Sequence, residues 1–500
     1  QAEEELSTSC VELYKMGQEN VPTTFEYIEN EVPSGSKVGF DGRTISAAMG
    51  AILELNLAKK NITISYEDDL LNEIWEDRPA LSDVKAFLLD IKYSGEDFTS
   101  KIARVREWMR ENNTTTHILT SLDDIAWLFN IRGGDIKYNP VVLSYAVITL
   151  DKAILFVDEN KLNDEIKTSF GEEVVEIKNY FEIYEFVKTI NKEEIVLIDS
   201  NKISYSILKN IPAGVKVVNG MNPSTKFKAQ KNSVEIENTK KAHIRDGVAV
   251  TKFMYWLKNN IGKIEITELS AADKITELRR EQGKFIEESF GTIAGYASNG
   301  AIIHYSVTKE SNTTLKDRGL FLLDSGGQYF DGTTDITRTF ALGELTKEEK
   351  YHFTTVARAM IRLSDVKFLH GVNGYYLDIL ARGILWNEGL NYNHGTGHGV
   401  GHVLNVHEGP NGFRLDNKES AILEEGMITT NEPGFYKAGS HGIRLENEML
   451  CVKGEKNEFG QFMEFEPITI APIDLDAINV ELMKEDEKAY LNEYHKIVFD

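Results

Sequence analysis

The sequence predicts an α/β (α+β) fold of several domains, and three observations lead to this prediction. The chain has 500 residues, too many for one hydrophobic core, which implies about two to four domains. Between about residues 95 and 230, short apolar runs alternate with helical stretches, the pattern of an α/β domain. Beyond about residue 232, two amphipathic helices precede apolar strands rich in glycine. We therefore expect three domains, over residues 1–80, 81–231 and 232–500.

The first domain is expected to combine short helices and strands. Apolar spacing indicates a helical run over residues 10–16, a strand over 37–40, a helix over 47–55 and a strand over 62–66. The segment Asp77-Arg78-Pro79 is interpreted as a linker, because proline ends regular elements and charged side chains favour solvent.

The second domain alternates strands and helices more clearly. Strands are expected over residues 117–119, 153–157, 174–177 and 195–198, and helices over 180–190 and 205–210. Neither of these two domains gathers histidine, cysteine and carboxylate side chains at spacings that suit catalysis or metal binding. We therefore expect the chemistry in the third domain.

The third domain opens with two helices that each have one apolar face. Their apolar residues recur at helical spacing, and they are Ala249, Phe253, Trp256 and Leu257 in the first helix and Ala271, Ile275 and Leu278 in the second. Both helices precede the first strand that carries a candidate functional residue.

Composition and charge narrow the classes of partner. A formal net charge of -24 disfavours nucleic acid, whose phosphates are bound by basic surfaces. No run of about 18 apolar residues is present, so no segment is expected to span a membrane. The two cysteines, Cys10 and Cys451, form no CxxC pair and suit a reducing environment, so we expect a cytoplasmic protein.

Two aspartates lie close together within residues 320–339. Four apolar residues lead directly into Asp324, and Asp335 follows eleven residues later. Between them, Asp331-Gly332 is a strong hairpin signal, so the two carboxylates should lie on neighbouring buried strands. Buried carboxylates repel one another and lose hydration, and a metal ion is the simplest compensation. A surface hairpin with solvated aspartates remains the alternative for this pair alone.

The hairpin must depart from the simplest pairing if these aspartates share a site. A two-residue turn at Asp331-Gly332 would place Asp335 opposite Gln328, which is about 13 Å from Asp324 at about 3.3 Å per residue. We therefore expect a shifted register or a bulge, with Gly326-Gly327 as the candidate position of a bulge.

Four histidines occur within fourteen positions of a glycine-rich segment, HGTGHGVGHVLNVHEGP, at residues 394–410. They are His394, His398, His402 and His407, and the glycines allow close backbone approach and sharp turns. The segment fits neither the GxGxxG loop of a dinucleotide site nor the HExxH motif of a zinc protease. We therefore interpret it as catalytic or metal-binding rather than structural.

Two glutamates complete the candidate cluster. A strand ends at Glu432, just before Pro433-Gly434, and a second strand carries Glu446. Glu448 has the same strand parity as Glu446, so the pattern alone leaves both open as the inward residue. An edge hairpin with solvated glutamates is the alternative interpretation of this segment.

The combined donor set points to a pair of divalent ions. Carboxylates and imidazole suit Mn, Co, Zn or Fe rather than copper(I). Four negative charges exceed what one divalent ion needs, whereas two ions about 3.5 to 4 Å apart, bridged by carboxylates and a hydroxide, would balance them. Such a pair activates water and stabilises a tetrahedral oxyanion, so the cluster favours hydrolysis.

The same segments resemble a known family, the pita-bread metallopeptidases. The resemblance is carried by DSGGQYFDGTTDITRT, HGTGHGVGHVLNVHEGP, NEPGFY and GIRLEN, and it extends to NGAIIHYS, ADKITELRREQ and, in the second domain, DDIAWLFNIRGGDIKYNPV. Within the family the chain is most similar to the long, three-domain, cytosolic Xaa-Pro aminopeptidases. This implies two creatinase-like α/β domains followed by a catalytic pita-bread domain, and a homodimer.

The resemblance also assigns site residues. It implies a dinuclear site, usually with manganese and with Co²⁺ or Zn²⁺ as alternatives, whose ligands are Asp324, Asp335, His398, Glu432 and Glu446. Asp335 and Glu446 would bridge the ions, which selects Glu446 over Glu448. Glu432 would also move the proton of the bridging water. Substrate orientation and proton transfer would fall to His304, His394 and His407, with Arg444 near Glu446, whereas His402 and His441 match no essential role.

The implied reaction is hydrolysis of the N-terminal Xaa-Pro bond of peptides by a water or hydroxide that bridges two metal ions. A prolidase, which takes only dipeptides, and a catalytically inactive peptide-binding homologue stay open as alternatives. A methionine aminopeptidase would lack the two preceding domains, and creatinase does not use these five ligands. Long family members begin before a segment such as QAEEEL and continue past LNEYHKIVFD, so we expect the start of the first domain and a short tail to be missing.

Overall fold

The computed structural model describes residues 6, 9–171, 174–418 and 420–500. The chain divides into two compact units. The first comprises Gln1–Leu88, Glu96–Asp135 and Val141–Ser224, and the second comprises Leu89–Gly95, Ile136–Pro140 and Thr225–Asp500. Both units contain helices and strands, which confirms the predicted α/β (α+β) class. The division into three domains stays a prediction.

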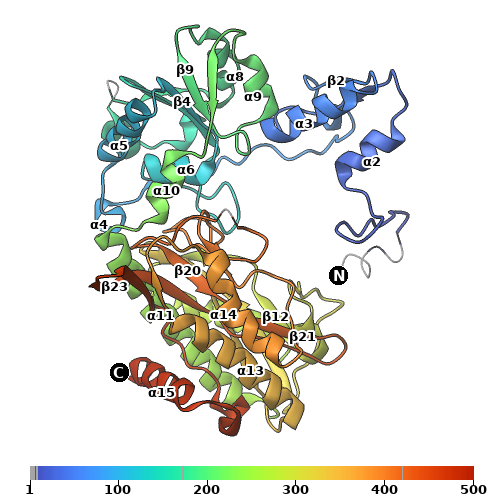
Figure 1. Ribbon diagram of the computed structural model, residues 1–500, viewed down its shortest axis with the longest axis vertical. Coiled ribbons are helices and arrows are strands. Elements are labelled where there is room, and N and C mark those ends of the chain that lie inside the picture. The colour runs from blue at the N-terminus through green and yellow to red at the C-terminus, as the bar shows by residue number, and fades with distance from the viewer. Residues whose placement is uncertain (1–5, 7–8, 172–173, 419) are drawn as a thin grey trace. The chain divides into compact units, whose positions relative to one another are not determined.

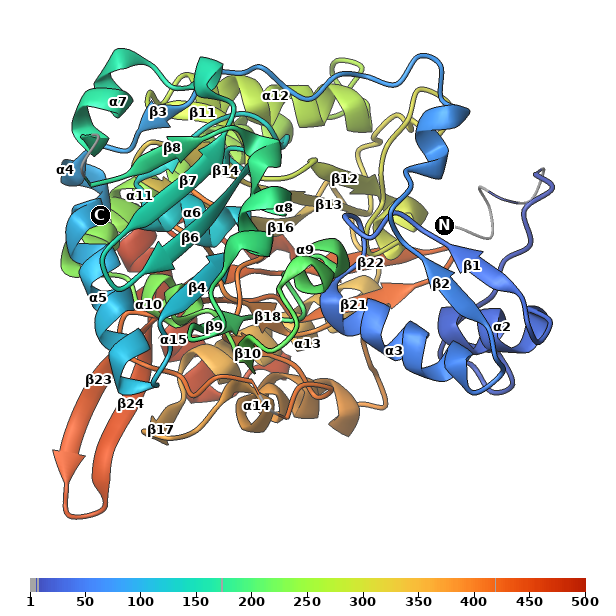
Figure 2. The same ribbon diagram turned by 90° about the horizontal axis from the view of Figure 1, so that it is seen from above.

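The first unit, blue to green in Figure 1, contains a mixed sheet of six strands in its described part. The strand order is β10-β9-β4-β6-β7-β8, and Figure 2 shows β6, β7 and β8 side by side. These strands are β4 (Thr116–Leu119), β6 (Ser144–Thr149), β7 (Ala153–Val157), β8 (Glu176–Lys178), β9 (Ile195–Ile198) and β10 (Lys216–Asn219). Two further pairs join β1 (Lys37–Gly39) to β2 (Thr63–Ser65) and β3 (Phe87–Leu88) to β5 (Ile131–Arg132). The helices are α2 (Thr24–Glu31), α3 (Ala47–Ala58), α5 (Phe98–Glu111), α6 (Leu122–Leu128), α7 (Asp164–Phe170), α8 (Ile183–Phe186) and α9 (Tyr205–Asn210).

The elements predicted for this unit are confirmed, with one exception. The expected strands and helices from residue 37 onward are found close to their predicted limits, although residues 180–190 form α8 flanked by short 3-10 turns. The helical run predicted over residues 10–16 is wrong, because residues 11–15 form neither helix nor strand. Val11 and Met16 are 58% and 63% exposed, so the segment lacks the tertiary contact that a short helix needs.

Two long helices precede the strands of the second unit, as predicted. Helix α11 (Ser233–Asn260) starts at Asn232, which forms a capping box with Glu235. Helix α12 (Glu268–Arg280) follows. The remaining helices are α4 (Ile91–Ser94), α10 (Pro223–Ala229), which crosses the boundary between the units, α13 (Lys347–Ser364), α14 (Gly374–Asn387) and α15 (Glu485–Phe499). In the described residues, no helix has both the length and the apolar character to cross a bilayer.

The strands of the second unit pair antiparallel in several small sheets. Their orders in the described residues are β11-β14-β15, β12-β13-β16 and β17-β24-β23-β20, with pairs β18-β19 and β21-β22. The strands are β11 (Phe285–Glu288), β12 (Ile293–Tyr296), β13 (Leu320–Ser325), β14 (Gly327–Tyr329), β15 (Gly332–Thr333), β16 (Ile336–Ala341), β17 (Lys367–Leu369), β18 (Gly397–His398), β19 (Gly412–Phe413), β20 (Ile428–Asn431), β21 (Gly434–Lys437), β22 (His441–Arg444), β23 (Asn447–Asn457) and β24 (Gly460–Pro467). Figure 2 shows β23 and β24 as a long hairpin.

Strand β13 is buried on both faces and ends at the candidate site. Phe321 and Leu323 belong to the core that contains the predicted apolar face of α11. Leu320 belongs to a second core, which includes residues of α13. Side chains alternate along a strand, so Asp324 points to the same side as Leu320. The two cores therefore clamp the strand that presents Asp324.

Candidate metal centre

The two aspartates lie closer together than the simplest hairpin allows. The turn is at Phe330-Asp331, one residue earlier than predicted, which moves the pairing register by two residues. Asp324 pairs with Thr337, so Asp335 is only two residues from the position opposite Asp324.

No extra residue is inserted to produce this register. Ser325 pairs with Ile336 and Gln328 pairs with Thr333, so two residues separate the pairs on each strand. A bulge at Gly326-Gly327 is therefore wrong, and a shifted register, the other predicted possibility, is confirmed. Glycine is needed here for a different reason, since a Cβ on Gly326 would come 1.9 Å from the backbone oxygen of Thr334.

The structure brings together the residues that the sequence analysis expected as ligands: Asp324, Asp335, His398, Glu432 and Glu446. One oxygen each from Asp324, Asp335 and Glu446 lie within 4.8 Å of one another, and so do ligand atoms of His398, Glu432 and Glu446. These residues come from the ends of β13 and β20, the start of β16, the strand β18 and the link between β22 and β23. Glu448 is absent from these groups of the described residues.

Three oxygens of the clustered carboxylates have no hydrogen-bond partner among the described residues. Asp324 Oδ1, Asp335 Oδ1 and Glu446 Oε1 are buried and accept no hydrogen bond from the described residues. Burial, reinforced by the neighbouring carboxylates, raises the pKa of Asp335 and Glu446 well above the ordinary range. Burial also raises the pKa of Glu432. Unpaired, buried oxygens that face one another are what a pair of divalent cations would satisfy, so the donor set fits two ions.

Neighbouring groups orient these side chains. Thr337 Oγ1 donates to Glu446 Oε2 at 2.8 Å, and Arg444 Nη2 donates to Asp324 Oδ2 at 2.6 Å. His398 donates from Nδ1 to the carbonyl of Gly399 at 2.9 Å. That bond places the lone pair on Nε2, which lies 3.5 Å from a carboxylate oxygen of Asp335. The imidazole is therefore in the tautomer that a metal ligand requires.

A tyrosine that the sequence analysis did not single out links His394 to this network. The hydroxyl of Tyr436 lies 2.9 Å from His394 Nε2 and accepts a hydrogen bond from Arg444 Nη1 at 2.7 Å. Burial and the charge of Arg444 lower the pKa of His394 to about 3. Tyr436 lies on β21, four residues after Glu432, and so has the same strand parity as that glutamate. This alternation is the sequence signal that could have found Tyr436.

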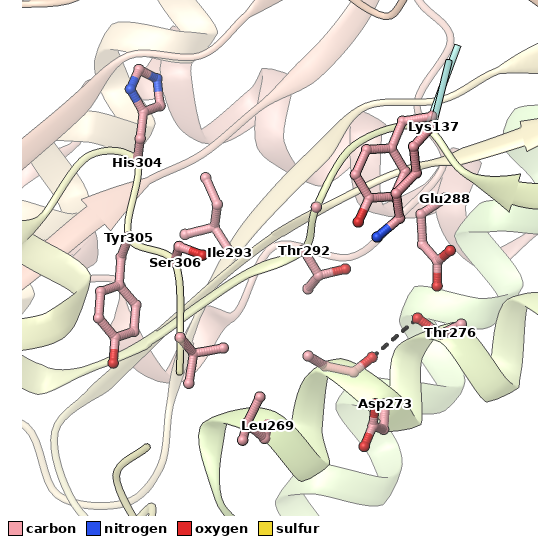
Figure 3. A pocket seen from close by; sticks show the side chains of 14 residues that line it. Lys137, Leu269, Asp273, Thr276, Glu288, Thr292, Ile293, His304, Tyr305 and Ser306 are labelled. Carbon is pink, nitrogen blue, oxygen red and sulfur yellow. Dashed lines mark hydrogen bonds between the residues drawn. The ribbon is translucent and has the colours of Figure 1, made fainter. Parts of the chain in front are cut away.

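The other two histidines flank the centre. The His407 ring lies 4.1 Å from the ring of His398, and desolvation by protein atoms together with the charge of His398 lowers the pKa of His407 to about 4. His304 lines a cavity of about 460 Å³, together with residues of α12 and β12 (Figure 3). Another lining residue, Ile293, pairs with Asp324 across the β12-β13 ladder, so this cavity adjoins the acidic cluster.

The two histidines without an expected role lie elsewhere. His402 is buried, with Thr239 Oγ1 and the carbonyl of Tyr93 each 3.0 Å from a ring nitrogen. His441 is buried 3.0 Å from His352. Both side chains are therefore part of the packed interior.

Protein families and individual relatives match this chain in sequence. The family model of the creatinase/prolidase N-terminal domain matches residues 77–235, that of metallopeptidase family M24 matches 237–453, and that of the C-terminal region of M24 peptidases matches 461–500. A probable Xaa-Pro aminopeptidase P of Leptosphaeria maculans is 37% identical over 516 residues, covering 100% of this chain and 85% of its own length. One from Coprinopsis cinerea is 38% identical over 525 residues, with coverages of 100% and 83%.

Solved structures of Xaa-Pro peptidases are also similar to this chain. An X-prolyl aminopeptidase from Caenorhabditis elegans, described as a cytosolic enzyme with a di-nuclear active site, is 33% identical with a TM-score of 0.92, covering 97% of this chain and 80% of that one. A Xaa-Pro dipeptidase from Bacillus anthracis, 22% identical with a TM-score of 0.61 over 76% of this chain and 99% of its own, is similar in fold. Since relatives more than 30% identical align with the entire chain, it belongs to metallopeptidase family M24, the pita-bread metallopeptidases that its motifs resemble.

Proposed function

We propose that this protein is a metal-dependent aminopeptidase that hydrolyses the N-terminal Xaa-Pro bond of peptides. The observation that carries the proposal is the convergence of four carboxylates and one imidazole, with several oxygens buried and unpaired. The relatives named Xaa-Pro aminopeptidase and the di-nuclear enzyme of Caenorhabditis elegans support the same reaction.

Two divalent ions would be held by Asp324, Asp335, His398, Glu432 and Glu446. By the family resemblance, Asp335 and Glu446 would serve both ions. When bound, such ions supply a hydroxide nucleophile at neutral pH and polarise the scissile carbonyl. We propose Mn²⁺ as the native metal, since carboxylate-rich sites suit it, with Co²⁺ and Zn²⁺ as alternatives.

The side chains of the protein would bind substrate and move protons. Glu432 is the carboxylate of the cluster that keeps 18% of its side chain exposed, and its raised pKa suits it to hold a proton on its carboxylate. Departure of a prolyl nitrogen requires a proton at that nitrogen. The lowered pKa of His407 favours its neutral imidazole, whose N–H can donate a hydrogen bond to the substrate carbonyl.

The remaining elements of the proposal follow from the family. We propose that His304 and His394 help to orient the peptide, with Arg444 holding Asp324 and Tyr436 in place. We propose creatinase-like domains over residues 1–80 and 81–231 ahead of a catalytic domain over 232–500, a cytoplasmic location and a homodimer. The description of the Caenorhabditis elegans enzyme as cytosolic supports that location.

A comparison of two substrates tests this function. Metal is removed by chelation, Mn²⁺ is restored, and hydrolysis of an Xaa-Pro-Xaa tripeptide is compared with that of an Xaa-Pro dipeptide. We expect release of the first residue from the tripeptide. Cleavage of the dipeptide alone would indicate a prolidase, and no cleavage of either would indicate a peptide-binding homologue. An anomalous-scattering map at the manganese edge would locate the ions.

A further inference from the structure

Glu448 is a fully buried carboxylate that the proposed reaction does not use. It lies on β23, two residues after Glu446, and is 0% exposed. A buried carboxylate costs free energy unless hydrogen bonds and a counter-charge stabilise it. The contacts of this side chain therefore indicate what it does.

One oxygen of Glu448 holds the backbone of a proposed ligand. Its Oε1 accepts a hydrogen bond from the backbone N–H of Asp335 at 2.8 Å. This amide lies between β15 and β16, outside the ladder of either strand, so the bond takes the place of a ladder partner. The position of the Asp335 side chain thus depends on Glu448.

The cross-strand partner of Glu448 does the same for a second proposed ligand. Thr430 on β20 pairs with Glu448 on β23. Thr430 Oγ1 accepts a hydrogen bond from the backbone N–H of His398 at 3.1 Å. Directly paired residues of an antiparallel ladder project from the same face, so this one pair supports both Asp335 and His398. We call Thr430 and Glu448 the platform pair.

The second oxygen of Glu448 faces a histidine from another element. Oε2 lies 3.2 Å from Nε2 of His243 on α11, and both side chains are 0% exposed. The backbone N–H of Glu448 donates to Thr469 Oγ1 at 2.8 Å, which holds this part of β23 in place. The carboxylate is thus kept in a buried position immediately behind the acidic cluster.

We propose that Glu448 is a positioning residue that, with Thr430, sets the affinity of the dinuclear centre for its divalent ions. The platform pair fixes the backbone at Asp335 and His398, and the charge of Glu448 adds to the negative field at the centre. Glu448 itself contacts neither metal nor substrate. The inference rests on the proposed function, because it requires that the centre binds metal.

The charge of Glu448 can be separated from its shape. In Glu448→Gln the amide oxygen can still accept the Asp335 N–H, but the negative charge is gone. Thr430→Val removes the acceptor for His398 and the side-chain hydrogen bond between Thr430 and Glu432 without changing a charge. Glu455→Gln is the matched control, since Glu455 is an exposed glutamate on the same strand. All four proteins, including wild type, are prepared as full-length apoprotein.

Calorimetric titration with Mn²⁺ measures the affinity directly. We expect Glu448→Gln and Thr430→Val to bind Mn²⁺ about 10- to 100-fold more weakly than wild type and Glu455→Gln, as for other groups that support metal ligands. At saturating Mn²⁺ the KM for a tripeptide should be unchanged. The visible absorption of the Co²⁺-loaded Glu448→Gln protein should also differ from wild type.

Wild-type Mn²⁺ affinity in Glu448→Gln would overturn the role of its charge, and wild-type affinity in Thr430→Val would overturn the platform. Circular dichroism of each apoprotein shows whether it is folded, and if one variant fails to fold the other still decides. If wild type and Glu455→Gln bind no Mn²⁺, the proposed function itself fails. If they bind two ions and both platform variants match them, only this inference fails.

Discussion

Replacing His407 by alanine distinguishes a residue that acts on substrate from one that holds metal. Ligand atoms of His407, His398 and Asp335 lie within 4.8 Å of one another, so distance alone admits metal ligation. However, His398 Nε2 faces two carboxylates, those of Asp335 and Glu432, at 3.5 and 3.7 Å. The ring of His407 lies against that of His398, and the residue keeps part of its surface accessible to solvent. We therefore expect His407 to act on substrate.

The size of the expected effect follows from that role. A positioned proton donor or acceptor contributes about 10² to 10⁴ in rate, which corresponds to about 2.7 to 5.4 kcal/mol of activation free energy. His407→Ala should lower kcat for an Xaa-Pro-Xaa peptide by this factor, while both ions stay bound. His398→Ala should instead lose metal, because His398 Nε2 faces the carboxylates of both Asp335 and Glu432.

The assay combines turnover at saturating Mn²⁺ with metal analysis of the same preparation. His370→Ala is the control, since His370 is 46% exposed and pairs with Glu424 away from the centre. It should keep both metal content and kcat. Loss of an ion from His407→Ala would refute the reasoning, and so would a kcat within a factor of about three of wild type.

Three further predictions concern the acidic cluster. The pKa of Asp335 and that of Glu446 are raised in the folded apoprotein. The protonated carboxyls therefore favour the folded state fully below the unfolded pKa of about 4, and this contribution is lost as pH rises toward the raised values. The chelated protein should melt at higher temperature at pH 5 than at pH 8, and Mn²⁺ should reduce that difference. Thr337→Val removes the hydroxyl that donates to Glu446 at 2.8 Å and should weaken Mn²⁺ binding about tenfold in a calorimetric titration, where an unchanged affinity would contradict the role of that hydrogen bond. Arg444→Met breaks a buried pair with Asp324 and should lower the free energy of unfolding of the metal-loaded protein by about 3 to 5 kcal/mol in urea denaturation. A loss below about 1 kcal/mol would show that Arg444 does not stabilise this carboxylate.

The strongest sequence signals were those in which the local pattern and the chemistry agree. Apolar runs that end in a carboxylate predicted the strand before Asp324 and the strand before Glu432, and both are present. Helical spacing predicted α11 and α12, whose apolar faces line one core. The helix expected over residues 10–16 failed, because spacing indicates which face could be buried but not whether anything covers it.

Contacts between distant segments were beyond the reach of the pattern. Strand parity treats Glu446 and Glu448 alike, yet only Glu446 joins the acidic cluster among the described residues. An oxygen of Glu448 instead accepts the backbone N–H of Asp335. The turn was misplaced by one residue, since Asp331-Gly332 is the usual signal but Asp331 is buried here. Tyr436 was likewise overlooked, as its importance lies in contacts to His394 and Arg444 that only the fold brings together.

The acidic cluster explains why this part of the fold must be rigid. Gathering buried carboxylates is unfavourable without cations, so the surrounding structure has to hold them in place before metal arrives. Strand β13 has that support, because Phe321 and Leu323 are buried in one core and Leu320 in another. Each such side chain stabilises the fold by about 1.5 to 3 kcal/mol. Metal binding and folding are thereby coupled, and a mutation in either core should weaken Mn²⁺ affinity as well as stability.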